Sequence, residues 1–393
     1  METAVQNMKI IYPNAEQGIV HRAQNSIFSY AGWPSVTRDE NGVLYAAASA
    51  FRVGHICPFG KTAMYVSRNG GKTWTPPIVV NDTYLDDRDA GILYMGNGRM
   101  LVTWFSHSVH AYQHSLIKSM KNWSSTMDIA PIMGMLGSYP YIPEEQAQGG
   151  SFLRISEDYG VTWSDPIRID GSAPHGPNIC RDGSLIYLGR DMYATNEAGE
   201  STENLSAYRS TDGGYHWEKI ATLTLPEGTS GKNFHEPHVA ELPDGRLLGA
   251  IRAQSADGRG EDTIQDGAWK KGNTLVPGYT IYTTVSSDGG RTWSDLKATG
   301  ISGAPPHLLV HSTGALICSY IRREPPFSIR AMVSYDMGES WSEDYVLTEC
   351  SVDGGYPGTV EMDDGSLVTV YYGKYGKDPK ASILSTRWTL AEK

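Results

Sequence analysis

The chain has 393 residues, of which 40% are apolar and 20% charged, with 43 glycines, 23 tyrosines and 10 tryptophans. This composition is typical of a globular protein with many short strands and tight turns, and it excludes collagen-like and disordered classes. A formal net charge of −11 argues against nucleic acid as a partner. The sequence contains no run of eighteen apolar residues, so we expect no transmembrane helix.

At the N-terminus, the first 25 residues have neither the basic start nor the long apolar run of a signal peptide. The four cysteines are widely scattered and show no disulfide or metal-ligand spacing. We therefore expect a cytoplasmic protein without a cofactor or metal. The segment "HEPH" (His235 to His238) superficially suggests a metal site, but two histidines three apart on a strand point to opposite sides, and no third ligand is evident.

A hairpin pattern begins near residue 33 and occurs six times along the chain. Each copy is a short apolar strand, a turn containing glycine and a second apolar strand, and each quoted segment begins nine residues before its glycine. The six turn glycines are Gly42, Gly98, Gly183, Gly245, Gly314 and Gly365. So regular a spacing indicates one repeated structural unit.

After five of these hairpins come a third strand, a turn resembling "SSDGGRTW" and a fourth strand. The five turns begin at Ser67, Ser156, Ser210, Ser286 and Ser334. Six repeats of four antiparallel strands predict an all-β, six-bladed β-propeller formed by one domain over residues 1–393. A strand near "GIVHRAQ" is expected to complete the sixth blade, and insertions are expected at about residues 106–150 and 253–278.

The direction of the strands separates two faces of this propeller. The serine-to-tryptophan turns join third to fourth strands, so they lie on the face opposite to the start of the first strands. There the Asp is expected to bond to turn amides while the Trp packs between blades. We interpret these turns as structural.

The opposite face, called the mouth, is expected to carry residues that can bind a ligand or take part in catalysis. First-strand starts, second-strand ends and neighbouring loops bring these residues there: Trp33, Arg52, His55, Lys61, Asp87, Arg88, Asp89, His175, Arg190, His235, Glu236, His238, Arg252, His307, Arg322, Arg330 and Tyr356. Guanidinium groups match carboxylate, sulfate or phosphate, so several arginines on an acidic protein predict a pocket for an anionic small molecule.

At these residues the chain resembles the sialidase superfamily, because the five turns match its Asp-box. "EPHVAELPDGRLLGAIR" is similar to the segment with the catalytic glutamate and second arginine, which implies these roles for Glu236 and Arg252. "GGYPGTVEMDDGSLVTVYY" is similar to the segment with the nucleophilic tyrosine, which implies Tyr356. The third arginine is expected at Arg322 or Arg330.

The chain departs from the sialidase pattern in two places. "Gly32-Trp33-Pro34" stands where the family has its first arginine, and Arg52, Lys61 or Arg88 are the candidates to replace it. The loop "FRVGHICPFGK" lacks the usual acid/base aspartate, and Asp87, Asp89 and His55 are the candidate proton donors. The remaining mouth residues His175, Arg190, His235 and His307 are expected to contact substrate.

Three functions remain open from these residues. The first is a glycoside hydrolase that removes a terminal acidic sugar, with Tyr356 as nucleophile and Glu236 as its base. The second is a uronate-directed lyase or an inverting hydrolase on the same scaffold, and the third is a non-catalytic carbohydrate-binding propeller. The partner is an anionic carbohydrate in each case, and the insertion at 106–150 is expected to act as a lid or a homo-oligomer contact.

Overall fold

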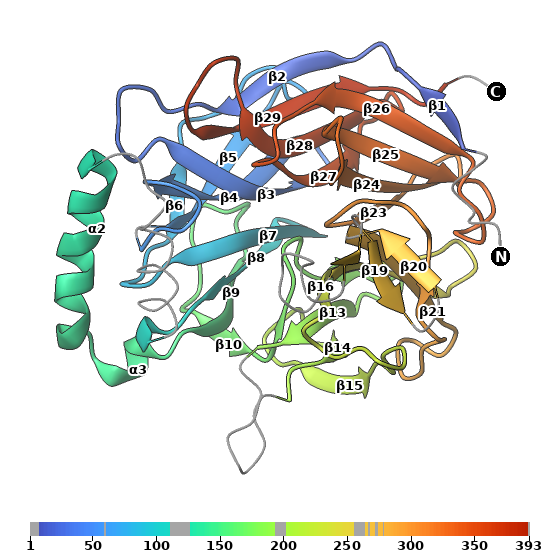
Figure 1. The fold of residues 1–393 in the computed structure, drawn as a ribbon, viewed down its shortest axis with the longest axis horizontal. Helices are drawn as coiled ribbons and strands as arrows, with labels where there is room; N and C mark the ends of the chain where they lie inside the picture. Colours follow the sequence, from blue (N-terminus) through green and yellow to red (C-terminus); the bar gives the residue numbers. More distant parts are fainter. Residues whose placement is uncertain are drawn as a thin grey trace.

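The computed structural model describes residues 8–58, 60–110, 126–192, 202–254, 264–265, 268–271, 274–277 and 279–391. Six small sheets surround a common centre, as the hairpin repeat predicted, and form a six-bladed β-propeller (Figure 1). Within the described residues, no helix is long and apolar enough to cross a membrane.

The strands of the first three blades follow one another in chain order. Blade 1 contains β3 (Tyr30–Arg38), β4 (Leu44–Arg52), β5 (Lys61–Ser67) and β6 (Ile78–Asn81). Blade 2 contains β7 (Asp87–Gly96), β8 (Arg99–Ser106), β9 (Gly150–Ser156) and β10 (Ile167–Ile169). Blade 3 contains β11 (Gly171–Ser172), β12 (Asn178–Ile179), β13 (Leu185–Asp191), β14 (Leu205–Ser210) and β15 (Glu218–Thr222).

The last three blades include both ends of the chain. Blade 4 contains β16 (Phe234–Glu241), β17 (Leu247–Gln254), β21 (Tyr279–Ser286) and β22 (Lys297–Ala298). Blade 5 contains β23 (His307–Val310), β24 (Leu316–Arg322), β25 (Ser328–Ser334), β26 (Glu343–Glu349) and the parallel strand β1 (Lys9–Ile11). Blade 6 contains β27 (Gly355–Glu361), β28 (Leu367–Lys374), β29 (Ala381–Trp388) and β2 (Glu16–His21).

The N-terminal strand closes the ring, as predicted. Strand β2 pairs with β29 from Glu16 opposite Arg387 to His21 opposite Ile383. Figure 1 shows this blue N-terminal strand beside the red C-terminal blade. Pairing the two ends of the chain in one sheet fixes the outer edge of blade 6.

Two additions interrupt the blades where the insertions were expected. Between β8 and β9 lie α2 (Thr126–Ser138), a 3-10 turn at Tyr139–Tyr141 and α3 (Glu144–Ala147). Ile132 and Tyr139 are buried against Val53, Cys57 and Leu85 of the blade 1 and 2 loops. Between β17 and β21 lies a small sheet of β18 (Ile264–Gln265), β19 (Ala268–Lys271) and β20 (Thr274–Pro277).

The five serine-to-tryptophan turns adopt the predicted structure on the face away from the mouth. In the turn at Ser286, the Asp288 carboxylate accepts hydrogen bonds from the backbone nitrogens of Arg291 (3.0 Å) and Thr292 (2.9 Å). Gly290 has a φ of +91°, which favours glycine. The Trp293 ring packs into the core between blades 3 and 4, so the turn ties neighbouring blades together.

Candidate active site

Four blades carry the same backbone irregularity at the mouth. Trp33, Asp89, Glu236 and Tyr356 occupy equivalent positions nine residues before their turn glycines, and their φ angles are +53°, +52°, +50° and +54°. The pairing register of each innermost strand shifts beside these residues. Left-handed backbone at a non-glycine residue is costly and clusters at functional sites.

Prolines occupy the equivalent positions in the other two blades. Pro174 interrupts the innermost strand of blade 3 between β11 and β12, and Pro305 precedes β23 in blade 5. Proline is fixed near a φ of −65° and cannot adopt the left-handed conformation. The irregularity is therefore confined to the four blades whose side chains are an indole, two carboxylates and a phenol.

Glu236, Tyr356 and Arg252 form one hydrogen-bonded group at the centre. The Tyr356 hydroxyl donates to Glu236 Oε1 at 2.5 Å, and Arg252 donates to Glu236 Oε2 at 2.5 Å. Arg252 also lies 3.3 Å from the Tyr356 hydroxyl. Burial alone raises the pKa of Glu236, but the charge of Arg252 and the bond from Tyr356 outweigh it and lower that pKa overall. Glu236 is therefore an ionised carboxylate in contact with a phenol.

Asp89 is the second carboxyl group at the centre. Burial raises its pKa to about 7, an effect that Arg88 opposes and that Glu236 reinforces. Its side chain is 7% exposed, and its Oδ1 atom is buried without a hydrogen-bond partner in the described part of the chain. Near neutral pH this group exchanges a proton easily, which is the property of a general acid or base.

Asp89 and Glu236 line one cavity of about 450 Å³ between blades 2, 3 and 4. Its other walls include His107, Arg190, Glu203 and His235. Arg190 is paired with Glu203 at 2.6 Å and donates to His235 at 3.0 Å. Burial lowers the pKa of His235 to about 4, so this histidine is neutral at physiological pH. This side of the mouth is polar but carries little net charge.

Two arginines outside the lining of this cavity share one aromatic neighbour, Tyr279. The Cζ atoms of Arg252 and Arg323 lie 5.3 and 5.7 Å from the centre of the Tyr279 ring. Arg323 also donates to the carbonyl of Ala304 at 3.1 Å. Arg252 is ion-paired with Glu236, whereas Arg323 makes its bond to a neutral backbone carbonyl.

Trp33 fills the position of the expected first arginine. Its indole is 1% exposed and contacts both Arg52 and Arg88, whose Cζ atoms are 4.6 and 4.3 Å from the centre of the ring. Arg52 is fully buried in an ion pair with Asp86, so it does not reach the mouth. Arg88 is less buried and lowers the pKa of Asp89, which places its charge beside the centre.

Asp87 has a different environment from Asp89, although burial also raises its pKa to about 7. Its carboxyl accepts bonds from Asn81 (2.8 Å), Thr83 (2.8 Å) and Ser106 (2.9 Å), all within blades 1 and 2. These three hydrogen bonds satisfy the carboxyl oxygens of Asp87 within its own surroundings. They indicate a structural role for Asp87, which was one of three candidate proton donors together with Asp89 and His55.

His55 belongs to a polar cluster at the rim of the centre. Its Nδ1 atom lies 3.1 Å from both the Tyr30 hydroxyl and the Asp353 carboxylate, and the Tyr30 hydroxyl donates to Asp353 at 2.9 Å. The His55 ring packs edge-on against Trp33, with centres 4.9 Å apart. Asp353 was not predicted, although it lies only three residues before Tyr356.

Several predicted residues lie away from this centre. Lys61 is paired with Asp82 near the surface. Arg322 and Arg330 line a separate cavity between blades 4 and 5, and Arg330 is buried in an ion pair with Asp344. Side chains alternate along a strand, so the residue of this segment that reaches Tyr279 is Arg323, one position beyond Arg322.

His175 and His307 lie deeper along the propeller axis together with His238. The rings of His238 and His307 are stacked 4.4 Å apart, and His175 packs edge-on to His307 at 4.9 Å. Burial lowers the pKa of all three below the ordinary value. Within the described residues, no group of three or more His, Cys, Asp or Glu side chains is arranged to hold a metal ion.

The sequence matches the profile of the BNR repeat-like domain over residues 60–370. The chain belongs to this BNR repeat-like family. A xyloglucanase from Acetivibrio thermocellus is 24% identical over 273 residues, which are 64% of this chain and 29% of the xyloglucanase. This BNR-repeat chain thus spans less than a third of the length of that curated relative.

Solved structures share the fold of this BNR-repeat protein. A protein of unknown function from Dyadobacter fermentans has a TM-score of 0.72 and 19% identity, over 96% of this chain and 100% of the other. An intramolecular trans-sialidase from Ruminococcus gnavus has a TM-score of 0.62 and 16% identity, over 95% and 97%. An α-L-arabinofuranosidase from Fusarium graminearum has a TM-score of 0.60 and 12% identity, over 95% and 97%. At these identities the similarity concerns the fold.

Proposed function

We propose that this protein is a glycoside hydrolase that removes a terminal acidic sugar, with Tyr356 as nucleophile. The observation that carries the proposal is the 2.5 Å hydrogen bond from the Tyr356 hydroxyl to the ionised Glu236, with Arg252 in contact with both. Burial and the charge of Glu236 raise the pKa of Tyr356 well above the ordinary value of ~10, so this phenol needs a base in contact to become a nucleophile. Sialidases are glycosidases of this unusual type.

In the first step, the Tyr356 oxygen forms a bond to the anomeric carbon while its proton moves to Glu236. The bond from that carbon to the leaving oxygen breaks, and this oxygen takes a proton from Asp89. The product is a glycosyl-tyrosine enzyme and a free alcohol. Because the phenol is neutral before attack, it approaches an anomeric carbon that carries a carboxylate without the repulsion that an anionic nucleophile would meet.

In the second step, Asp89 accepts a proton from water as the water attacks the same carbon. The bond to Tyr356 breaks and Glu236 returns the proton to the phenolic oxygen. Asp89 suits both steps because its pKa of about 7 lets it hold a proton in one and accept a proton in the other. His55 is the less suitable donor, because its Nδ1 atom is engaged by Tyr30 and Asp353.

The charged groups around Glu236 orient the substrate. Arg252 and Arg323 beside Tyr279, with Arg88 in place of the missing first arginine, are proposed to bind the acidic group. The cavity beside Glu236 is lined by Asp89, the proposed donor, and Arg190 there is already neutralised by Glu203. We therefore assign the leaving group to this polar, nearly neutral cavity.

A second candidate is an inverting hydrolase for neutral sugars, in which Asp89 is the acid, Glu236 the base and Tyr356 a positioning residue. Trp33 favours it, because an indole replaces the arginine that would bind a sialic acid carboxylate. The arabinofuranosidase and the xyloglucanase also show that proteins similar to this chain include enzymes named for other sugars.

The test is a panel of 4-methylumbelliferyl glycosides: the α-N-acetylneuraminide, the glucuronide and the α-L-arabinofuranoside. Fluorescence reports cleavage of the glycosidic bond, and the ultraviolet absorbance of an unsaturated sugar shows whether that cleavage was an elimination. Turnover of an acidic glycoside that Glu236→Gln abolishes supports the proposal, and turnover of the neutral glycoside alone supports the second candidate. Elimination, or no turnover on this panel and on acidic oligosaccharides, would contradict both.

A further inference from the structure

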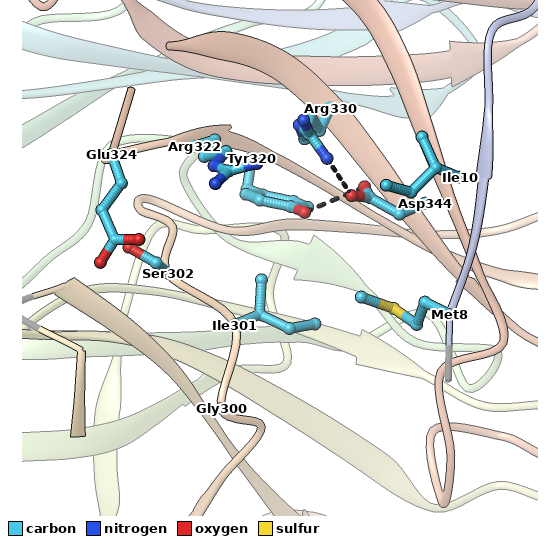
Figure 2. A pocket seen from close by; sticks show the side chains of 10 residues that line it. All are labelled: Met8, Ile10, Gly300, Ile301, Ser302, Tyr320, Arg322, Glu324, Arg330 and Asp344. Atoms are coloured by element: carbon cyan, nitrogen blue, oxygen red, sulfur yellow. Dashed lines mark hydrogen bonds and ion pairs between the residues drawn. The ribbon is translucent and has the colours of Figure 1, made fainter. Parts of the chain in front are cut away.

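A second cavity lies between blades 4 and 5, outside the central site. Its volume is about 230 Å³, and it is lined by the segment after β22, by one face of β24 to β26 and by the N-terminal strand β1 (Figure 2). None of the residues assigned to the reaction lines it. The cavity therefore needs an explanation separate from the proposed hydrolysis.

One charged network in this cavity is complete without a ligand. Arg330 is paired with Asp344, and the Tyr320 hydroxyl donates to the same carboxylate at 2.9 Å (Figure 2). The side chains of Arg330 and Asp344 are 7% and 5% exposed. A buried pair of this kind has little capacity left to bind an additional charge.

Two further charges in the cavity are not compensated in this way. Among the described residues, neither Arg322 nor Glu324 has an ion pair or a side-chain hydrogen bond, although Arg322 lowers the pKa of Asp344 through space. Arg322 is half-buried at the end of β24, and Glu324 is exposed two residues later. The hydroxyl of Ser302 is buried nearby without a partner in the described part of the chain.

The rest of the lining is apolar. Met8, Ile10 and Ile301 contribute aliphatic side chains, and Figure 2 shows Met8 and Ile10 at the opposite end of the cavity from Glu324. The cavity thus combines a cation, an anion and a hydroxyl, each without a side-chain partner among the described residues, with an aliphatic wall. A ligand that satisfies all four carries a carboxylate, an ammonium group and a compact apolar body.

We propose that this cavity is a binding site for a free α-amino acid with an aliphatic side chain. Arg322 binds its carboxylate, Glu324 binds its ammonium group, and the side chain packs on Met8, Ile10 and Ile301. Water occupies about 30 Å³ per molecule in the liquid, so the cavity has room for an amino acid of moderate size but not for an oligosaccharide. The site is independent of the proposed hydrolase activity.

Isothermal titration calorimetry with L-leucine tests the proposal on the full chain. We expect a dissociation constant in the range of about 0.1–5 mM, since so small a ligand gains limited free energy. The probes 4-methylpentanoate and 3-methylbutylamine, which each lack one charge, should bind at least about tenfold more weakly. Arg322→Gln and Glu324→Gln should each weaken leucine binding to the same extent, because each leaves one ligand charge unpaired.

The matched control is Glu349→Gln, which removes an exposed carboxylate from the same blade and should leave leucine binding unchanged. The absence of leucine binding at about 20 mM would overturn the proposal, since this concentration is above the expected range of the dissociation constant. Equal binding of leucine and 4-methylpentanoate, or binding unaffected by both charge variants, would also overturn it. Circular dichroism of each variant excludes loss of folding as the cause.

Discussion

At the face away from the mouth, each Asp-box carboxylate bonds to its own turn, whereas at the mouth Glu236 is bonded by a residue from another blade. Asp288 accepts from Arg291 and Thr292, three and four residues away, but Glu236 in blade 4 accepts from Tyr356 in blade 6. The same chemical group is therefore structural where its partners are local. At the mouth, closure of the ring brings a side chain from another blade to the carboxylate, and this places it beside a group with which it can exchange a proton.

The backbone shows the same division between the two faces. On the face away from the mouth, most left-handed positions are glycines such as Gly245, which adopt them at little cost. Asn97, Tyr159 and Met337 are the non-glycine exceptions there among the described residues. At the mouth they are filled by Trp33, Asp89, Glu236 and Tyr356, where the conformation costs of order ~1–3 kcal/mol each. At the mouth, the cost of the left-handed backbone therefore falls on residues whose side chains point to the axis.

Glu236→Gln is expected to have the largest effect on catalysis. The amide cannot accept the Tyr356 proton, so kcat should fall by at least about 10³-fold on the substrate identified by the glycoside panel. The control is Glu241→Gln, at the other end of the same strand, where the carboxylate accepts a bond from the backbone nitrogen of Arg181. Steady-state kinetics should show normal turnover for this control. Equal loss in both variants would mean that the two ends of β16 do not differ in function.

Tyr356→Phe decides between the two proposed mechanisms. If Tyr356 is the nucleophile, kcat should fall by at least about 10³-fold. A mechanism-based fluorinated glycoside should then label Tyr356 in the wild type, as detected by peptide mass spectrometry. If Tyr356 only positions Glu236, the loss should be nearer tenfold, as for one hydrogen bond of ~1.4 kcal/mol. The control Tyr371→Phe removes a hydroxyl that bonds to Gln17 in the same blade and should leave kcat unchanged.

Asp89→Asn should affect the pH profile and the leaving-group dependence together. The acid form of Asp89 persists up to its pKa of about 7, so kcat/KM of the wild type should fall as the pH rises above that value. The variant should lose this alkaline limb, and its rate loss should be about 10²-fold or more for an alkyl leaving group but small for a nitrophenol. An unchanged profile would remove Asp89 as the acid.

The folding stability of the same variant provides an independent measurement. The pKa of Asp89 is higher in the folded than in the unfolded chain, so the carboxyl increasingly disfavours folding as pH rises from about 4 to above 7. Asp89→Asn should therefore raise Tm more at pH 8 than at pH 5. Asp87→Asn should instead lower Tm, because it disrupts the bonds from Asn81, Thr83 and Ser106. The pKa of Asp87 is also raised to about 7, so this loss should be smaller at pH 8 than at pH 5.

The sequence was sufficient to predict the repeat and its consequences. The nine-residue spacing to each turn glycine predicted the six blades, and strand direction predicted which face would gather Glu236 and Tyr356. Both predictions depend only on periodicity and alternation, which are local properties of the chain. These predictions can therefore be made without knowing any distance between blades.

The predictions that differ from the structure concern side chains whose contacts come from other blades. Arg52 ends a second strand as expected, but Asp86 of the next blade holds it in a buried ion pair. Asp87 and Asp89 look alike in "LDDRDAG", but only Asp89 stands nine residues before its turn glycine, and the hydrogen bonds around Asp87 engage that carboxyl locally. Arg322 and Arg323 differ by one position, which reverses the face of the strand. The ion pair of Arg52 and the hydrogen bonds of Asp87 depend on tertiary contacts that no spacing in the sequence specifies.

Asp288→Ala should have the smallest effect and test the other face. We expect Tm to fall by only a few degrees with kcat and KM unchanged. The matched control is Asp295→Ala, which removes an exposed carboxylate close to the same turn. Hydrogen bonds from Thr292 lower the pKa of Asp288 to about 2, below its unfolded value. Its contribution to stability is therefore complete above pH ~4 and is lost as the pH falls through about 2. The difference in Tm between wild type and Asp288→Ala should accordingly shrink on acidification, and a loss of turnover at neutral pH would show that this face also serves catalysis.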